Sequence, residues 1–228
     1  METSIDTESA RFRAWFGKSR VTDGGGAPLL VFRGEHGRRG EGMFQTRGGA
    51  ITFADRDAAI GYATSPNDRA DSVHEARVMP AYLRIERPFM LEPADPYLEL
   101  QTVAEALGRA EATRVALKFE TWIRDTDNWR RIRDEVGPVS VSAFLKRHPD
   151  RLADLYFLAY PYLDDPAETA RLKAAGFDGA VHAGSSVTAG KAEYKVFGTA
   201  GVLPAAPRWL APEEVREFAA APAPAMAP

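Results

Sequence analysis

Apolar and polar positions divide the chain into three blocks, and in the first block short apolar runs alternate with polar turns. Thr7–Phe16 places its aromatic side chains on one side of a predicted amphipathic helix. Two apolar runs, Leu29–Phe32 and Ala50–Ala54, predict strands. Asp55 is the expected N-cap of a helix over Asp55–Ala63, where apolar residues recur at helical spacing.

Glycines and prolines mark the turns of this first block. The glycine triplet at 24–26 lies between two apolar runs. This favours a hairpin turn over a phosphate-binding loop, because such a loop leads from a strand into a helix. A third strand is predicted over Ala76–Phe89. Pro80 and Pro88 lack backbone donors, so we expect this strand at a sheet edge or a bulge.

The second block, Tyr97–Ala175, has the periodicity of helices. Apolar residues at spacings of three and four predict a core stripe, and they are Val115, Phe119, Trp122, Ile123, Trp129 and Ile132, then Leu152, Leu155, Tyr156 and Ala159. The last helix has Asp165 as its N-cap, Glu168 three residues later as a box-like pair, and Gly176 as its C-terminal stop.

The third block returns to short strands. Gly179–His182 and Glu193–Phe197 predict two strands that flank a Gly/Ser loop over Ala183–Gly190. Strands, then helices, then strands again indicate an α+β fold. A short helix entered at Pro212 follows, and the alanine- and proline-rich segment 219–228 predicts a disordered tail.

Composition fits one folded domain followed by this tail. The chain has 228 residues, of which 45% are hydrophobic and 27% charged, enough to bury a core. We expect a single domain over residues 1–218, with a helical insert at about 97–175. The absence of cysteine excludes disulfides, thiolate metal sites and cysteine nucleophiles. The four histidines lack the paired spacing of a metal-binding helix, so no metal is expected.

Charge and hydropathy exclude further classes of protein. With 29 Lys and Arg against 32 Asp and Glu, the chain is not a uniformly basic nucleic-acid coat. No apolar run approaches the ~20 residues of a transmembrane helix, and the N-terminus has no signal-peptide pattern. We expect no membrane partner, and either a cytoplasmic location or delivery into a target cell by another route. Nucleophile-elbow, Walker and dinucleotide-glycine motifs are also missing.

Three short segments carry the most informative residues: Val31–Gly34, Gly49–Ala54 and Glu193–Phe197. In these segments the chain resembles the ADP-ribosyltransferase superfamily. In that family the first strand ends in His or Arg before Gly, the second carries Tyr, Ser or Thr, and the third places a Glu. The likeness covers about Phe12–Pro93 and Arg171–Val202, and it includes counterparts in phage-related polyvalent proteins.

The resemblance implies a fold and an activity. The fold is a split antiparallel β-sheet core with a helical insert. The activity is mono-ADP-ribosyl transfer from NAD+, used as a substrate, to a macromolecular acceptor, with release of nicotinamide, as in toxin, effector or phage-related enzymes. The acceptor is a protein, with nucleic acid as the alternative. Cleavage of the nicotinamide–ribose bond passes through an oxocarbenium-like state, which a neighbouring carboxylate stabilises.

The resemblance also implies three catalytic residues. Glu193 is the carboxylate beside the ribose, and Thr52 orients it by a hydrogen bond. Arg33 binds phosphate or ribose oxygens with its planar fork. Taken alone, each residue has a plain structural interpretation: an edge-strand arginine, a common strand former and an ordinary strand glutamate.

Four residues are implied as contacts of NAD+. Arg33 is the first, and Gly34 offers its backbone to the nicotinamide carboxamide. Phe53 belongs to the second motif, and Tyr62 stacks on the ring. A core position for Tyr62 is the other interpretation. Eight basic residues against three acidic ones between positions 11 and 47 support an anionic ligand, with a solvated basic face as the alternative. The loop over 37–49 is expected to close over the dinucleotide.

Departures from the family pattern leave other functions open. Lys191 stands two positions before Glu193, where arginine-modifying members have an acidic residue, so arginine is a less expected acceptor. The first motif continues to Glu35 where polyvalent relatives have His-Gly-Thr. An NAD+ glycohydrolase and an inactive binding module that keeps the fold are therefore alternatives. In the insert, Trp129–Arg133 puts three arginines beside an indole as a predicted acceptor contact, with a solvated helix face as the alternative.

Overall fold

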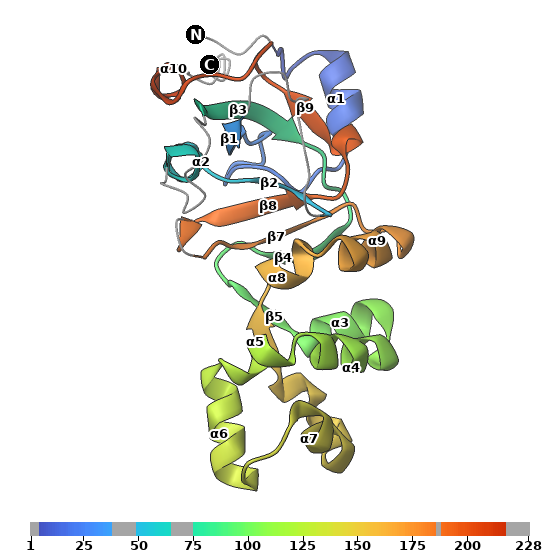
Figure 1. The fold of residues 1–228 in the computed structure, drawn as a ribbon. Coiled ribbons are helices and arrows are strands. Elements are labelled where there is room, and N and C mark those ends of the chain that lie inside the picture. The colour runs from blue at the N-terminus through green and yellow to red at the C-terminus, as the bar shows by residue number, and fades with distance from the viewer. Residues whose placement is uncertain (1–4, 38–48, 65–74, 186–187, 218–228) are drawn as a thin grey trace.

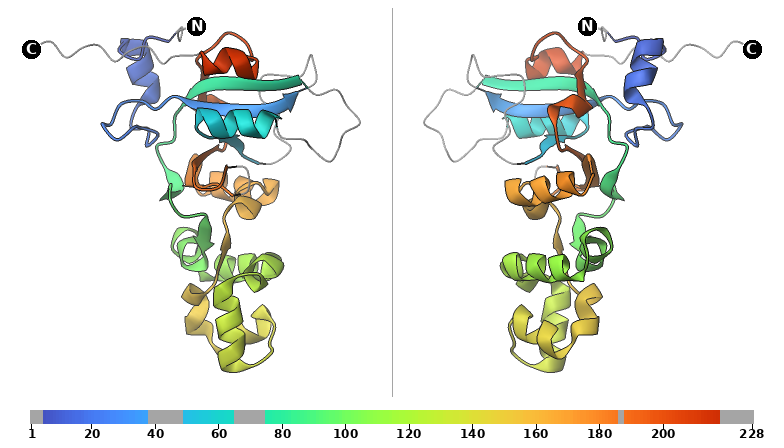
Figure 2. Two further views of the ribbon diagram at one scale, coloured as in Figure 1. Left: turned by 90° about the vertical axis from the view of Figure 1, so that its left-hand side faces the viewer. Right: turned by 90° about the vertical axis from the view of Figure 1, so that its right-hand side faces the viewer.

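The computed structural model describes residues 5–37, 49–64, 75–185 and 188–217. It has an α+β fold in which a three-stranded sheet lies above a four-stranded sheet, as seen in Figure 1. A two-stranded ribbon leads from the lower sheet to a group of helices. The views in Figure 2 place these helices at the far end of the molecule from the upper sheet. The predicted tail at 219–228 lies outside the described residues.

The upper sheet has the order β1 (Val31–Gly37), β3 (Glu75–Leu83) and β9 (Val202–Pro204), with antiparallel pairings. The expected edge position is wrong for Pro80, because β3 is the central strand. It is confirmed for Pro88, which begins a separate edge strand of the lower sheet and lies at a shift in strand register. Phe32 lies opposite Pro80, but its backbone exchanges hydrogen bonds with Ala54. The Pro80 carbonyl accepts from Ala205 at 2.8 Å. The ladder therefore needs no donor from Pro80 toward β1.

The third predicted strand, Ala76–Phe89, is in fact two strands in different sheets. β3 ends at Leu83, and β4 (Pro88–Glu92) joins the lower sheet. Between them the Asp178 carboxylate accepts from the backbone N–H groups of Glu86 and Arg87, each at 2.9 Å. This distant carboxylate fixes the turn that moves the chain from one sheet to the other.

The lower sheet has the order β2 (Ile51–Phe53), β8 (Ala192–Val196), β7 (Gly179–Ala183) and β4. β7 pairs antiparallel with β8, and β8 with β2, but β4 and β7 are parallel. The expected antiparallel sheet is thus corrected at this pairing. The insert connects β4 to β7, and a connection of that length permits a parallel crossover.

The two sheets are joined where β1 meets the end of β2. Phe32 and Ala54 exchange backbone hydrogen bonds of 2.9 and 2.8 Å across the split. Apolar side chains fill the space between the sheets: Val31, Ile51, Phe53, Ala81, Leu83, Ile85 and Val196. The two sheets are therefore hydrogen-bonded to each other at Phe32 and Ala54, and apolar side chains pack between them.

Local signals explain the helices around the upper sheet. α1 (Ala10–Phe16) is capped by Ser9, and α2 (Arg56–Thr64) by Asp55, whose carboxylate accepts from the Ala58 N–H at 2.8 Å. The cap at Asp55 confirms the prediction. The glycine triplet forms a tight turn in which Asp23 accepts from the Ala27 N–H at 2.9 Å, and the chain continues into β1. The predicted turn is confirmed.

The insert begins and ends as a pair of antiparallel strands, β5 (Tyr97–Glu99) and β6 (Tyr156–Leu158). Tyr156 therefore belongs to a strand, and the helical stripe predicted through it is wrong, because pairing with β5 overrides the local spacing. The elements between these strands are α3 (Leu100–Leu107), α4 (Arg109–Lys118), α5 (Glu120–Arg124), α6 (Asp127–Val136), α7 (Val141–Arg147) and the 3-10 helix η1 (Pro149–Asp154).

The chain returns to the core through α8 (Tyr160–Leu163) and α9 (Pro166–Ala174). Asp165 caps α9, and Gly176 ends it at a φ of 88°, both as predicted. Glu168 is not the second half of a capping box, because its buried carboxylate binds Arg114 and Lys118 of α4. After β8 come η3 (Thr199–Gly201), β9 and α10 (Pro212–Arg216). Within the described ranges, no helix is long and apolar enough to cross a bilayer.

Candidate active site

Buried polar side chains gather on one face of the lower sheet. Eight polar or charged residues are buried in the described part of the chain, and four of them lie together: His182, Thr188, Glu193 and Lys195. His182 is on β7 opposite Glu193 on β8, and Lys195 lies two residues along the same strand. Alternate strand residues point to one face, so His182, Glu193 and Lys195 share the face that is opposite the inter-sheet core, and Thr188 reaches Glu193 from the connection between β7 and β8.

The Glu193 carboxylate is held at both oxygens. Thr188 Oγ1 donates a hydrogen bond to Oε1, while the Lys195 ammonium lies 3.3 Å from Oε2. The residue is only 9% exposed. A carboxylate in such a setting has a fixed orientation, and low local dielectric strengthens its action on a nearby charge.

Lys195 connects three parts of the molecule. Its Nζ donates to Thr52 Oγ1 on β2 at 2.9 Å and to Asp164 Oδ1 after α8 at 2.7 Å, in addition to facing Glu193. The side chain is 2% exposed. An ammonium has three donors, and here each has an oxygen within reach. The buried charge is therefore fully compensated.

Arg33 reaches the same group of residues from the upper sheet. Its Nη1 donates to the backbone carbonyl of Thr52 at 3.1 Å, and its Nε donates to Glu35 at 2.6 Å. Glu35 also accepts from Arg77 at 3.0 Å. The side chains of Arg33, Glu35 and Arg77 are between 12% and 15% exposed. Arg33, Thr52, Lys195 and Glu193 thus form one continuous set of contacts across the split between the sheets.

His182 has a defined tautomer in this setting. Its Nδ1 lies 2.7 Å from the Ala183 carbonyl, which is an acceptor, so Nδ1 carries the proton. Nε2 is buried without a hydrogen-bond partner among the described residues, 3.6 Å from the Glu193 carboxylate. Burial, and then the charge of Lys195, lower the pKa of His182 from 6.5, whereas Glu193 acts in the opposite direction. The neutral ring therefore presents a lone pair to Glu193.

The remaining predicted NAD+ contacts lie in different surroundings. Gly34 packs under α2, since a Cβ there would lie 2.0 Å from the Ala59 carbonyl oxygen. This close packing accounts for the glycine without a ligand. Phe53 is 1% exposed in the core between the sheets, on the opposite side of β2 from Thr52, so its side chain does not line the polar face. Tyr62 is 50% exposed on α2. A stacking role for Tyr62 stays a prediction.

The structure therefore brings Arg33, Thr52 and Glu193 into one network and adds Lys195, His182 and Asp164 to it. The direct hydrogen bond expected from Thr52 to Glu193 is replaced by a contact through Lys195, which donates to Thr52 Oγ1 and lies 3.3 Å from Glu193. The register of Thr52 opposite Lys195 creates the network, and a single strand sequence carries no sign of that register. The alternation of Glu193 and Lys195 with apolar neighbours was the available signal. Most of the loop over 37–49 lies outside the described residues. Among the described residues, no group of three acidic or histidine side chains is placed to hold a metal ion.

The chain was compared with protein-family models, with curated proteins and with solved structures, and no match was found. The assignment of function therefore depends on the geometry of this network and on the sequence motifs that it joins.

Proposed function

We propose that the protein is a mono-ADP-ribosyltransferase that transfers ADP-ribose from NAD+ to a macromolecular acceptor and releases nicotinamide. One observation carries the proposal: Arg33, Thr52 and Glu193, from segments far apart in the sequence, belong to one network of contacts where the sheets separate. The motif resemblance selects the same three residues. This agreement between two separate lines of argument supports the proposal.

The chemistry assigns a task to each side chain. Glu193, held by Thr188 and Lys195, stabilises the positive charge that develops on the ribose as nicotinamide leaves. The acceptor then forms a bond to the ribose carbon and loses a proton, for which Glu193 is the base if it lies within hydrogen-bond reach. Arg33 offers its guanidinium to the phosphates or ribose oxygens of NAD+. Lys195 positions the carboxylate, and Thr52 acts through Lys195, whose ammonium donates to Thr52 Oγ1.

A second candidate is a binding module that keeps the fold but has lost turnover. The charges of the site favour it in one respect, because Arg33 is bonded to Glu35, and the ammonium of Lys195 offsets part of the Glu193 charge. An enzyme needs these contacts to rearrange when NAD+ binds. An NAD+ glycohydrolase, the third possibility, would use the same residues with water as the acceptor.

Labelled NAD+ distinguishes the three functions. The full chain is incubated with NAD+ carrying a labelled adenosine, alone and in a cell lysate, and nicotinamide release and labelled macromolecules are followed by mass spectrometry. A transferase releases nicotinamide and labels a macromolecule in the lysate. A glycohydrolase releases nicotinamide and free ADP-ribose only. Failure to release nicotinamide, with or without lysate, would remove both enzyme assignments.

A further inference from the structure

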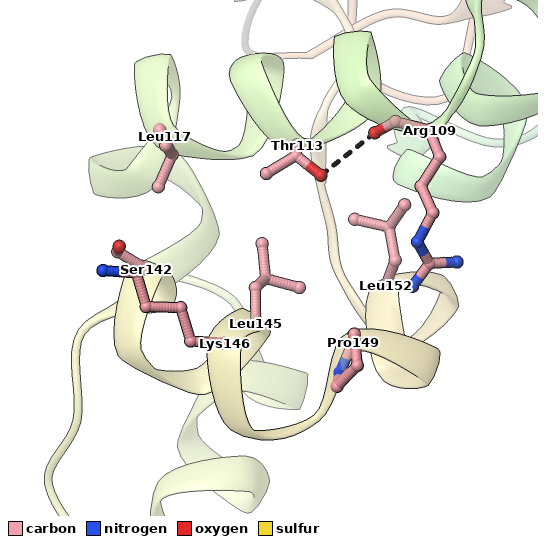
Figure 3. A pocket seen from close by; sticks show the side chains of 8 residues that line it. All are labelled: Arg109, Thr113, Leu117, Ser142, Leu145, Lys146, Pro149 and Leu152. Atoms are coloured by element: carbon pink, nitrogen blue, oxygen red, sulfur yellow. Dashed lines mark hydrogen bonds between the residues drawn. The ribbon is translucent and has the colours of Figure 1, made fainter.

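The insert contains a groove between α4, α7 and η1, which is shown in Figure 3. Arg109, Thr113 and Leu117 succeed one another at intervals of four and occupy one face of α4. Leu145 and Leu152, both buried, form an apolar floor, and Lys146 stands on α7 at the side opposite Arg109. The groove thus has an aliphatic floor between two cations.

The two faces of α4 differ in their partners. On the opposite side, Arg114 and Lys118 bind the buried carboxylate of Glu168 on α9. In the described part of the chain, neither Arg109 nor Lys146 forms an ion pair, and no carboxylate lines the groove. Leu117 is 44% exposed. Cations and apolar area on this face therefore lack the complement that the other face has.

The size and chemistry of the groove select one kind of occupant. Its volume is about 170 Å³, which is below the ~300 Å³ at which pockets for small organic ligands begin. A single side chain of a bound protein segment therefore fits the groove better than a free small molecule does. Its lining has no aromatic side chain on which a nucleic-acid base would stack. An aliphatic residue flanked by carboxylates matches both the floor and the two cations.

We propose that this groove binds a short acidic segment of a protein, in which an aliphatic side chain enters between Arg109 and Lys146. That the segment belongs to the acceptor of ADP-ribose rests on the proposed function; the binding itself does not. In the surface predicted at Trp129–Arg133, the three arginines are exposed but the indole does not reach the surface. Trp129 is fully buried, and Arg130 and Arg131 are bonded to Asp127 and Asn128 of their own helix.

The test is fluorescence anisotropy with the full chain and a labelled peptide, Glu-Asp-Leu-Leu-Asp-Glu, at physiological salt. Two matched peptides replace either the leucines with serine or the acidic residues with lysine. The proposal expects the first peptide to bind at least about tenfold more tightly than either control. Absence of binding up to about 1 mM, or equal affinity of the three peptides, would overturn it.

Two charge-matched double variants locate the site. Arg109→Glu with Lys146→Glu is expected to weaken binding at least about tenfold, and Arg130→Glu with Arg131→Glu on α6 less than about twofold. Circular dichroism checks that both variants are folded. Equal losses would mean general attraction to a basic surface and would overturn the groove. So would self-association of the chain that the groove variant abolishes, because the occupant would then be a second copy.

The two proposals fail in different measurements. If the peptide binds in the groove but the wild-type chain releases no nicotinamide, the docking surface stands and the transferase assignment falls. If nicotinamide is released and the peptide does not bind, the groove proposal falls alone. Where both succeed, the groove variant should reduce labelling of the lysate target and leave nicotinamide release in its absence unchanged.

Discussion

The sheet core and the helices of the insert bury their polar side chains differently. In the described part of α3 to α7, Thr126 is the buried polar residue, and it caps α6. On one face of β7 and β8, His182, Thr188, Glu193 and Lys195 are buried together. Burial of polar and charged groups costs free energy unless they are bonded. The insert helices are therefore stabilised by apolar packing, whereas the sheet face keeps costly groups that packing alone does not require.

At the boundary between the two regions, a buried carboxylate is paired with partly exposed cations. Glu168 on α9 is fully buried, and it is paired with Arg114 and Lys118, which are about one-third exposed. Asp164, just before α9, contacts Lys195 of the sheet face. Glu168 thus pairs with cations of the insert, and Asp164 pairs with the polar network of the sheet face. Apolar packing and the Glu168 ion pairs therefore build the fold, whereas the buried polar groups of the sheet face are available for chemistry.

The largest expected effect is on turnover, from Glu193→Gln. The substitution keeps the shape and removes the charge, so nicotinamide release should fall at least ~10²-fold, with NAD+ affinity nearly retained. Initial rates of nicotinamide release and titration calorimetry measure the two effects. Glu86→Gln serves as the control, since Glu86 lies at an exposed turn. Turnover within a fewfold of the wild type for Glu193→Gln would exclude this residue from catalysis.

Glu168→Gln tests the boundary. Loss of the charge weakens three ionic hydrogen bonds, two from Arg114 and one from Lys118 at 2.7 Å, and the free energy of unfolding should fall by about 2 kcal/mol. Water reaches the two cations and replaces part of the loss. Glu135→Gln is the matched control, because Glu135 pairs with Arg151 but is 61% exposed, and it should cost below ~1 kcal/mol. Equal losses in urea unfolding would contradict the distinction.

These residues also show how far sequence reasoning reaches. Caps at Asp55 and Asp165, the glycine turn and the stop at Gly176 were predicted correctly because they depend on neighbours within four residues. The central position of β3 and the strand at Tyr156 were missed because pairing with distant strands decides them. The network around Lys195 was missed for the same reason. Its partners come from three elements, and the register that joins them is not a local property.

Arg33→Lys tests whether the arginine that lies between the two sheets binds NAD+. Lysine keeps the charge but cannot bond Glu35 and the Thr52 carbonyl with one planar group, so NAD+ affinity should fall about tenfold. Titration calorimetry measures it. Arg56→Lys on the exposed side of α2 is the control and should leave affinity unchanged. Unchanged affinity together with unchanged kinetics in Arg33→Lys would place Arg33 outside the site.

The buried imidazole predicts a dependence of stability on pH. Because burial and Lys195 lower the pKa of His182 in the folded state, the unfolded chain takes up a proton first as the pH falls below 6.5. The free energy of unfolding should therefore decrease from pH 6.5 downward, until the folded-state pKa is reached. Glu193, Lys195 and Asp164 face this ring and set its pKa. His182→Gln should make the decrease between pH 7 and pH 5.5 smaller in urea unfolding. An identical pH profile in the variant would contradict it.

The smallest effect is expected from Tyr162→Phe, on the free energy of unfolding. Its hydroxyl is buried and has no hydrogen-bond partner among the described residues, next to the paired carboxylate of Glu168. Burial, and then the charge of Glu168, raise the pKa of Tyr162, so the group stays a neutral hydroxyl. Tyr162→Phe removes an unsatisfied polar atom and keeps the ring contacts with Phe89 and Phe119. The free energy of unfolding should stay the same or rise by up to about 1 kcal/mol, measured against Tyr160→Phe. A loss above ~1 kcal/mol would mean that the hydroxyl has a bonded partner, unlike Nε2 of His182 on the sheet face, which is buried without one among the described residues.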